Sequence, residues 1–153
     1  MEGGQAMNAI KVLFLCTGNS CRSQMAEGWA RHLKGAAIDA YSAGIESHGM
    51  NHLAVKAMAE AGVDIGGQAS KTVDAVRDVP FDFVVTVCGH AGETCPMWLR
   101  SKARVIHVGF DDPPRLATGA RTEEEAMVHY RRVRDEIRAF VESLPGSLGC
   151  SRP

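Results

Sequence analysis

Two cysteines and an arginine lie close together in the segment CTGNSCRS, residues 16–23. Cys16 directly follows the apolar run 10–15, and helical periodicity begins at Ser23. A loop that leaves a strand and enters a helix directs several backbone N–H groups and the positive end of the helix dipole at one point. Arg22 adds a planar cation suited to two oxygens of a tetrahedral oxyanion. We therefore predict that an oxyanion is bound by this segment: Thr17, Gly18, Asn19, Ser20, Cys21, Arg22 and Ser23.

Cys16, the first residue of this loop, is placed to act as a nucleophile. An ordinary thiol has a pKa of about 8.5, and a helix N-terminus or a nearby cation lowers it to roughly 3.5–7.5. We expect Gly18 and Asn19 to supply backbone conformations with positive φ, and Ser23 to cap the helix. For Cys21 we favour a role in packing over direct catalysis. The alternative for the whole segment is a glycine-containing turn with incidental thiols.

Two further thiols follow the most apolar strand pattern of the chain, FDFVVTV at 81–87. Cys88 comes directly after it, so Cys88 and Cys16 are expected at the same edge of a parallel sheet. Cys95 lies seven residues later, about 10 Å away if the segment is helical, which exceeds the ~7 Å limit for a disulfide. The alternative is a metal site formed by Cys88, His90 and Cys95, but this spacing matches no common zinc pattern. We predict no metal.

A pair of carboxylates follows the fourth strand pattern, in the segment FDDPP at 110–114. Ligands of open α/β sheets bind at the carboxyl ends of the strands, where Cys16 is also expected. Asp111 and Asp112 are therefore candidates for the acid that protonates a group leaving the oxyanion. The alternative is that both are turn-forming residues before proline.

The elements that must position these residues alternate between strands and helices. Strand patterns cover 10–15, 37–44, 81–87 and 104–110, and helical patterns cover about 23–34, 53–61, 72–79 and 122–144. Such alternation predicts an α/β fold with a parallel sheet covered on both faces. We expect a single catalytic domain at 8–145, with flexible tails at 1–7 and 146–153.

Composition excludes several classes of protein. Of the 153 residues, 45% are hydrophobic, and the formal net charge is −1. We therefore expect a globular chain that buries a hydrophobic core and binds neither nucleic acid nor a membrane. The N-terminus has no apolar stretch that would act as a secretion signal. Five cysteines, an odd number, indicate a reducing compartment in which thiols serve chemistry, which predicts a cytoplasmic protein. We expect a monomer.

The motif CTGNSCRS, with the Cys-(x)5-Arg spacing, resembles the active-site loop of the low-molecular-weight protein tyrosine phosphatases and of the thioredoxin-coupled arsenate reductases that share their fold. The resemblance extends from Lys11 to the last helical pattern. SQMAEGW and YSAGIESHG are most similar to the reductase branch. The resemblance implies a four-stranded parallel sheet of order 2-1-3-4 with helices on both faces.

The resemblance also implies a reaction and a role for each residue. Cys16 attacks arsenate, and Asp112, the aspartate directly before proline, protonates the departing hydroxide. Cys88 and then Cys95 complete a three-cysteine relay that releases arsenite. Thioredoxin then reduces the Cys88–Cys95 disulfide. No tightly bound cofactor is implied, and phosphate or sulfate would mimic arsenate.

A phosphatase acting on phosphotyrosine or small phosphomonoesters through a Cys16 phosphoenzyme is the alternative function, and residual phosphatase activity is expected in either case. A non-catalytic sensor of oxyanions or redox state is a third hypothesis. Many phosphatases of this family carry an aromatic residue after the Asp-Pro pair, where this chain has Pro114. This difference disfavours a protein tyrosine substrate.

Some reductases of this family hold a potassium ion, with ligands that correspond to Asn19, Glu27 and Ser42. Their remaining ligands correspond to Ala69 and Lys71, so a potassium site is not expected here, and we expect Lys71 to pair with Glu27 instead. The histidines His48, His52 and His107 are interpreted as ordinary loop or core-edge residues.

Overall fold

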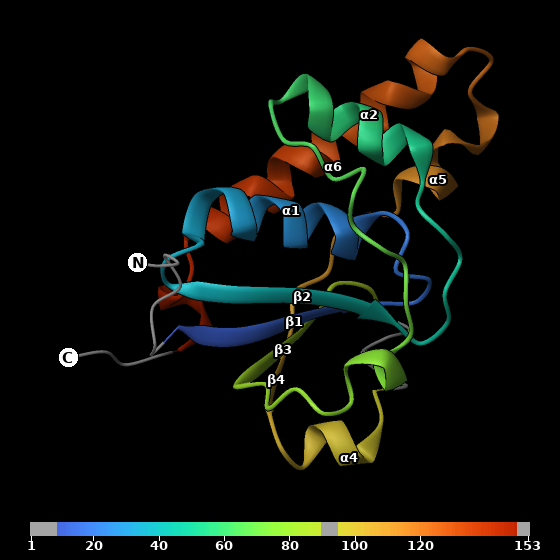
Figure 1. Cartoon of the computed structure of the whole chain (residues 1–153). Helices are drawn as coiled ribbons and strands as arrows, with labels where there is room; N and C mark the ends of the chain where they lie inside the picture. The colour runs from blue at the N-terminus through green and yellow to red at the C-terminus, as the bar shows by residue number, and fades with distance from the viewer. Residues whose placement is uncertain (1–8, 90–94, 150–153) are drawn as a thin grey trace.

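A computed structural model describes residues 9–89 and 95–149. Its centre is a parallel sheet of four strands: β1 (Ile10–Cys16), β2 (Ile38–Gly44), β3 (Phe83–Thr86) and β4 (Arg104–His107) (Figure 1). The strand order is β2-β1-β3-β4, which confirms the predicted α/β class and topology. Cys16 pairs with Gly44 of β2, and Leu15 pairs with Thr86 of β3, so the carboxyl ends of the three strands meet at one edge.

Helices cover both faces of this sheet. The long helices α1 (Arg22–Lys34) and α6 (Glu123–Glu142) pack together on one face with α2 (His52–Glu60), whereas α4 (Met97–Arg100) lies on the other (Figure 1). Short helices complete the described chain: η1 (Val73–Val76), α5 (Pro113–Leu116), η2 (Ala117–Gly119) and η3 (Gly146–Leu148). In the described residues, no helix is long and apolar enough to cross a membrane.

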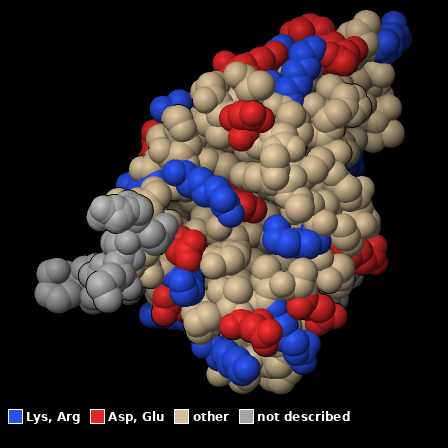
Figure 2. Space-filling view, viewed as in Figure 1, with Lys and Arg blue, Asp and Glu red and all other residues tan. Residues whose placement is uncertain are grey.

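The core forms around the central strands. Val12, Leu13, Phe14 and Leu15 of β1 are completely buried, as the continuous apolar run predicts for a strand covered on both faces. Trp29 of α1 is also buried, and its indole N–H donates to the carbonyl oxygen of Arg134 in α6. Basic and acidic side chains are interspersed over the face drawn in Figure 2, in agreement with the small net charge.

Two segments differ from the prediction. The proline-rich stretch after β4 is not among the predicted helical patterns, yet it forms α5 and η2. Pro113 is at the first helical position of α5, where its missing N–H costs nothing. The expected C-terminal tail is wrong for residues 146–149, since η3 forms there and Leu148 is buried. The rest of the expected tails, residues 1–7 and 150–153, lies outside the described residues.

We expect Phe14→Ala to lower the free energy of unfolding by about 3–5 kcal/mol, because it leaves a cavity in the middle of β1. Val128→Ala in α6 is the matched control, since Val128 is exposed and its truncation should change stability by no more than about 0.5 kcal/mol. Urea unfolding followed by circular dichroism measures both. Equal losses in the two variants would contradict the central position of β1.

Candidate active site

The loop between β1 and α1 takes its shape from Asn19. This residue has φ 49°, the left-handed conformation expected from the sequence. Its side chain is completely buried; Nδ2 donates to Oγ of Ser23 at 2.9 Å, and Oδ1 accepts from the backbone N–H of Lys71 at 2.8 Å. Ser23 therefore binds Asn19 and does not cap the helix as predicted. The residue that precedes α1 is Cys21, which makes no side-chain capping bond.

Gly18 is required for space, not for its conformation. The positive φ predicted for Gly18 is wrong, because Asn19 alone provides it in this loop. A Cβ atom added to Gly18 would lie 2.2 Å from Nδ1 of His48. The imidazole ring thus occupies the place that any other side chain would take.

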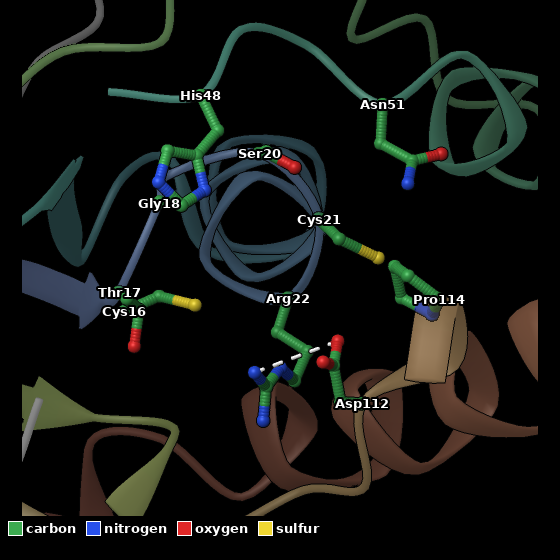
Figure 3. A pocket seen from close by; sticks show the side chains of 10 residues that line it. All are labelled: Cys16, Thr17, Gly18, Ser20, Cys21, Arg22, His48, Asn51, Asp112 and Pro114. Carbon is green, nitrogen blue, oxygen red and sulfur yellow. Dashed lines mark ion pairs between the residues drawn. The ribbon is translucent and has the colours of Figure 1, made fainter. Parts of the chain in front are cut away.

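The loop forms the wall of a cavity of about 400 Å³ (Figure 3). Seven of the predicted site residues line it: Cys16, Thr17, Gly18, Ser20, Cys21, Arg22 and Asp112. Pro114, His48 and Asn51 complete the lining. Asn19 and Ser23 are buried beneath the loop and are not among the lining residues. Their observed role is to hold the loop in shape.

Arg22 joins the loop to the segment that carries the predicted acid. Its Nη1 donates to the carbonyl oxygen of Phe110 at 2.9 Å, and Nη2 lies 3.5 Å from Oδ1 of Asp112. The ion pair with Asp112 is visible in Figure 3. Nε is buried and has no hydrogen-bond partner among the described residues. A buried N–H without a partner is costly, so this donor fits an oxyanion bound in the cavity.

The thiol of Cys88 lies against the loop, as expected from the ends of β1 and β3. It shares a hydrogen bond of 3.1 Å with the hydroxyl of Thr17, the residue after Cys16. The influence of Cys88 and burial raise the pKa of Cys16, whereas Arg22 and the backbone N–H of Thr17 lower it. The net direction is upward, so the lowered pKa predicted for Cys16 is wrong for this arrangement. The sequence indicated both Arg22 and the neighbouring Cys88, but not the upward direction of the pKa of Cys16.

The other two described cysteines are also buried thiols. Burial and the carboxylate of Asp112 raise the pKa of Cys21, which keeps this thiol protonated. Burial likewise raises the pKa of Cys95, and Arg100 opposes it. Residues 90–94 between these two cysteines, which include His90, lie outside the described residues. The predicted disulfide between these two cysteines stays a prediction.

A known family of proteins matches most of this chain. The model of the family "Low molecular weight phosphotyrosine protein phosphatase" matches residues 11–150. The chain belongs to this family. The resemblance to this family, predicted from CTGNSCRS, is thereby confirmed.

Similar members of the family bear a reductase name. The arsenate reductases of Halalkalibacterium halodurans and Bacillus subtilis are 56% and 55% identical, over 86% and 82% of this chain and 91% and 88% of theirs. A solved arsenate reductase in a phosphate-binding state is 31% identical and superimposes with a TM-score of 0.73, covering 90% of this chain and 98% of its own. An arginine phosphatase from Geobacillus stearothermophilus, 21% identical with a TM-score of 0.68 over 92% of this chain and 93% of its own, shares the fold.

The potassium ligands of some family members correspond here to a different network. The buried carboxylate of Glu27 accepts from Oγ of Ser42 at 2.6 Å and pairs with Arg31 at 2.7 Å. Nζ of Lys71 instead donates to the carbonyl oxygen of Ala69, so the predicted Lys71–Glu27 pair is wrong. Arg31, one helical turn from Glu27, takes that place. The oxygen atoms of this network do not fit a potassium ion, because the guanidinium of Arg31 already neutralises the carboxylate of Glu27.

No cluster of three or more histidine, cysteine or acidic side chains that could hold a metal ion occurs within 9–89 and 95–149.

Two pocket residues of this family member were not predicted from its sequence. His48 was interpreted as an ordinary histidine, yet its ring lines the cavity. Asn51 caps α2 by accepting from the N–H groups of Leu53 and Ala54, and its Nδ2 donates to the hydroxyl of Tyr130. An asparagine before a helical pattern is a recognisable capping signal. Nothing in the local pattern indicates the contact with Tyr130, 79 residues away.

We expect Gly18→Ala to displace His48 and the loop, and to lower the free energy of unfolding by about 1–3 kcal/mol through overpacking. Binding of inorganic phosphate, measured by calorimetry, should weaken in the same variant. Gly67→Ala is the matched control, because an added Cβ meets nothing within 4 Å there. Equal phosphate affinity in the two variants would contradict the close contact at Gly18.

We expect Cys88→Ala to lower the pKa of Cys16, since the influence of Cys88 is the largest cause of its increase. The rate at which iodoacetamide alkylates Cys16 should then rise at a lower pH than in the unsubstituted protein, because the thiolate is the reactive form. Mass spectrometry of the peptide that contains Cys16 measures this rate. A midpoint that moves to higher pH would show that Cys88 stabilises the thiolate.

Proposed function

We propose that this protein reduces arsenate to arsenite by a relay of Cys16, Cys88 and Cys95, with thioredoxin as the reductant. The observation that carries the proposal is the position of the Cys88 thiol, which shares a hydrogen bond of 3.1 Å with Thr17, the residue after Cys16, beside a pocket that Arg22 and Asp112 line. A hydrolase needs only the first of these thiols. The names of the similar proteins support the choice of arsenate.

The first step is a displacement at arsenic(V). The thiol of Cys16 passes its proton to an oxygen of the bound hydrogen arsenate as its sulfur forms an S–As bond. The bond from arsenic to a hydroxyl group breaks, and Asp112 gives a proton to that hydroxyl, which leaves as water. Arg22 holds the remaining oxygens through its fork of donors, and Nε is the donor that still lacks a partner among the described residues. Arsenic has not changed its oxidation state at this point.

The second step is the reduction. The thiolate of Cys88 attacks the sulfur of Cys16, an S–S bond forms, and the electron pair of the S–As bond passes to arsenic. Arsenic(III) leaves as arsenite, and the two sulfurs together have lost two electrons. The place of Cys88 supports this step, because its thiol bonds Thr17, the residue after Cys16, and the nucleophile therefore lies beside its target.

The third step returns the enzyme to its starting state. Cys95 attacks the sulfur of Cys88, which releases the thiolate of Cys16 and forms a Cys88–Cys95 disulfide. The dithiol of thioredoxin reduces this disulfide by exchange and becomes oxidised itself. Such a cycle requires a compartment in which thiols stay reduced, so we infer a cytoplasmic protein. All three thiols of the cycle belong to one chain, so we also infer that a monomer suffices.

Hydrolysis of a phosphomonoester is the second candidate function. Cys16, Arg22 and Asp112 suffice for a phosphoenzyme that water then cleaves, and Cys88 takes no part in it. Pro114 lines the pocket and offers no aromatic face for phosphotyrosine, which favours a small substrate. Since the first step is common to both reactions, residual phosphatase activity is expected.

The decisive experiment compares Cys88→Ser with the unsubstituted protein in two assays. With arsenate, thioredoxin, thioredoxin reductase and NADPH, the variant should lose all measurable NADPH oxidation, because no second thiol can take the electrons. Hydrolysis of p-nitrophenyl phosphate should stay within about a factor of three, a difference of less than 1 kcal/mol in the barrier.

Cys150→Ser is the matched control, because it removes a thiol that the relay does not use. It should keep both activities. Arsenate reduction that survives Cys88→Ser would exclude the relay. An unsubstituted protein that hydrolyses p-nitrophenyl phosphate but consumes no NADPH with arsenate would favour the phosphatase.

A further inference from the structure

His48 is held against the oxyanion loop by the backbone on either side of it. The N–H groups of Ile45, Glu46 and His48 donate to the carbonyl oxygens of Cys16, Thr17 and Gly18 at 3.1, 2.8 and 2.9 Å. These three bonds lay residues 45–48 along the loop. The imidazole ring then fits over Gly18, where a side chain is missing. The position of the ring is thus fixed relative to Cys16.

The two nitrogens of this ring have different surroundings. Nε2 shares a hydrogen bond of 2.7 Å with a carboxylate oxygen of Glu46, which is not among the residues that line the pocket. Nδ1 has no hydrogen-bond partner among the described residues. In Figure 3 one ring nitrogen faces the interior of the pocket and the other faces away from it. Because Glu46 takes the outer one, the inner nitrogen is Nδ1.

The carboxylate of Glu46 determines which nitrogen carries the proton. A carboxylate accepts hydrogen bonds, so in the neutral ring the proton is on Nε2 and Nδ1 keeps its lone pair. The backbone N–H groups and Arg22 donate to the oxyanion. Among the lining side chains, the hydroxyls of Thr17 and Ser20 can donate or accept, and the carboxylate of Asp112 accepts. Nδ1 of His48 adds an acceptor without a hydrogen at Gly18, on the opposite side of the pocket from Asp112.

We propose that His48 is a specificity-determining residue whose Nδ1 accepts a hydrogen bond from the hydroxyl group of the bound oxyanion, so that the site prefers hydrogen arsenate and hydrogen phosphate to sulfate. The inference rests on the proposed function only in requiring that a tetrahedral oxyanion occupies the pocket. Sulfate has the same shape and charge as hydrogen phosphate but carries no proton. Its oxygen would meet the lone pair of Nδ1 without a hydrogen between them.

Asp112 is a lining side chain whose carboxylate only accepts when ionised, so a comparable role could be argued for it. Its carboxylate lies across the pocket from His48 and is paired with Arg22 (Figure 3). In the proposed reaction Asp112 gives a proton to the oxygen that leaves. It therefore contacts that oxygen, and not the hydroxyl group from which Nδ1 of His48 accepts. The two residues therefore make distinguishable predictions for anions that do not react.

The test is the ratio of the dissociation constants for sulfate and inorganic phosphate, measured by calorimetry on the reduced protein in mildly alkaline buffer, where an ordinary imidazole is neutral. We expect His48→Leu to lower this ratio roughly three- to ten-fold, the range of one hydrogen bond, with the half-exposed position of the ring favouring the lower end. His48→Asn should retain most of the ratio, because its amide oxygen can replace Nδ1 as the acceptor. His52→Leu, at an exposed histidine outside the pocket, should leave the ratio unchanged.

Glu46→Ala provides a second measurement that leaves every pocket side chain in place. It frees the ring to place its proton on Nδ1, so the ratio should fall, by less than in His48→Leu. An unchanged ratio in folded His48→Leu or in Glu46→Ala overturns the inference. So does a preference for phosphate that His48→Leu retains and Asp112→Asn abolishes. Absence of arsenate turnover in the unsubstituted protein would refute the proposed function alone, since the binding ratio is measured without turnover.

Discussion

Asn19 is held in a left-handed conformation by two hydrogen bonds of its buried side chain, and the remaining loop geometry depends on this constraint. One bond reaches Ser23 in the first turn of α1, and the other reaches the backbone of Lys71, 52 residues away. The backbone carbonyl of the same residue accepts from Gln24, which also bonds Ala69. The loop is thus attached to α1 and to the segment after α2. Its N–H groups are organised before any anion arrives, so binding does not have to order them.

A second requirement is the parallel register of the sheet. Because β1 lies between β2 and β3, the backbone that follows each strand emerges at the same edge, and the N–H of Val87 still bonds the carbonyl of Leu15. That bond leaves Cys88 directly beside the start of the loop. The pocket and the second thiol are therefore consequences of one pairing. A chain with the same loop but another strand next to β1 would have the oxyanion site without the neighbouring sulfur.

The sequence predicted most of the fold and the chemical centre of the site, for physical reasons that differ between residues. Apolar runs and the turn residues after them determined the strands, and Cys16 and Arg22 followed from their place between a strand and a helix. Asp112 followed from its place after the fourth strand together with the family resemblance. These are local signals, readable within ten residues or so of the chain.

Contacts between distant segments could not be predicted in this way. The ring of His48 over Gly18, the pairing of Arg31 with Glu27 and the raised pKa of Cys16 all depend on side-chain directions that only packing determines. Glu27 shows the difficulty, since Arg31 and Lys71 are both cations that could neutralise it, and helical spacing alone does not choose between them.

The burial of all four described thiols separates two kinds of reagent by size. Each cysteine keeps at most 6% of its surface exposed, so a folded protein cannot bring a disulfide of its own into contact with them in this conformation. A small tetrahedral anion meets no such barrier, because the pocket leads it to Cys16. In this conformation the protein's thiols therefore cannot exchange with the disulfides of other folded proteins. A small anion can therefore reach Cys16, whereas a macromolecular oxidant cannot reach the described thiols, and this difference in access is a kinetic property of the fold.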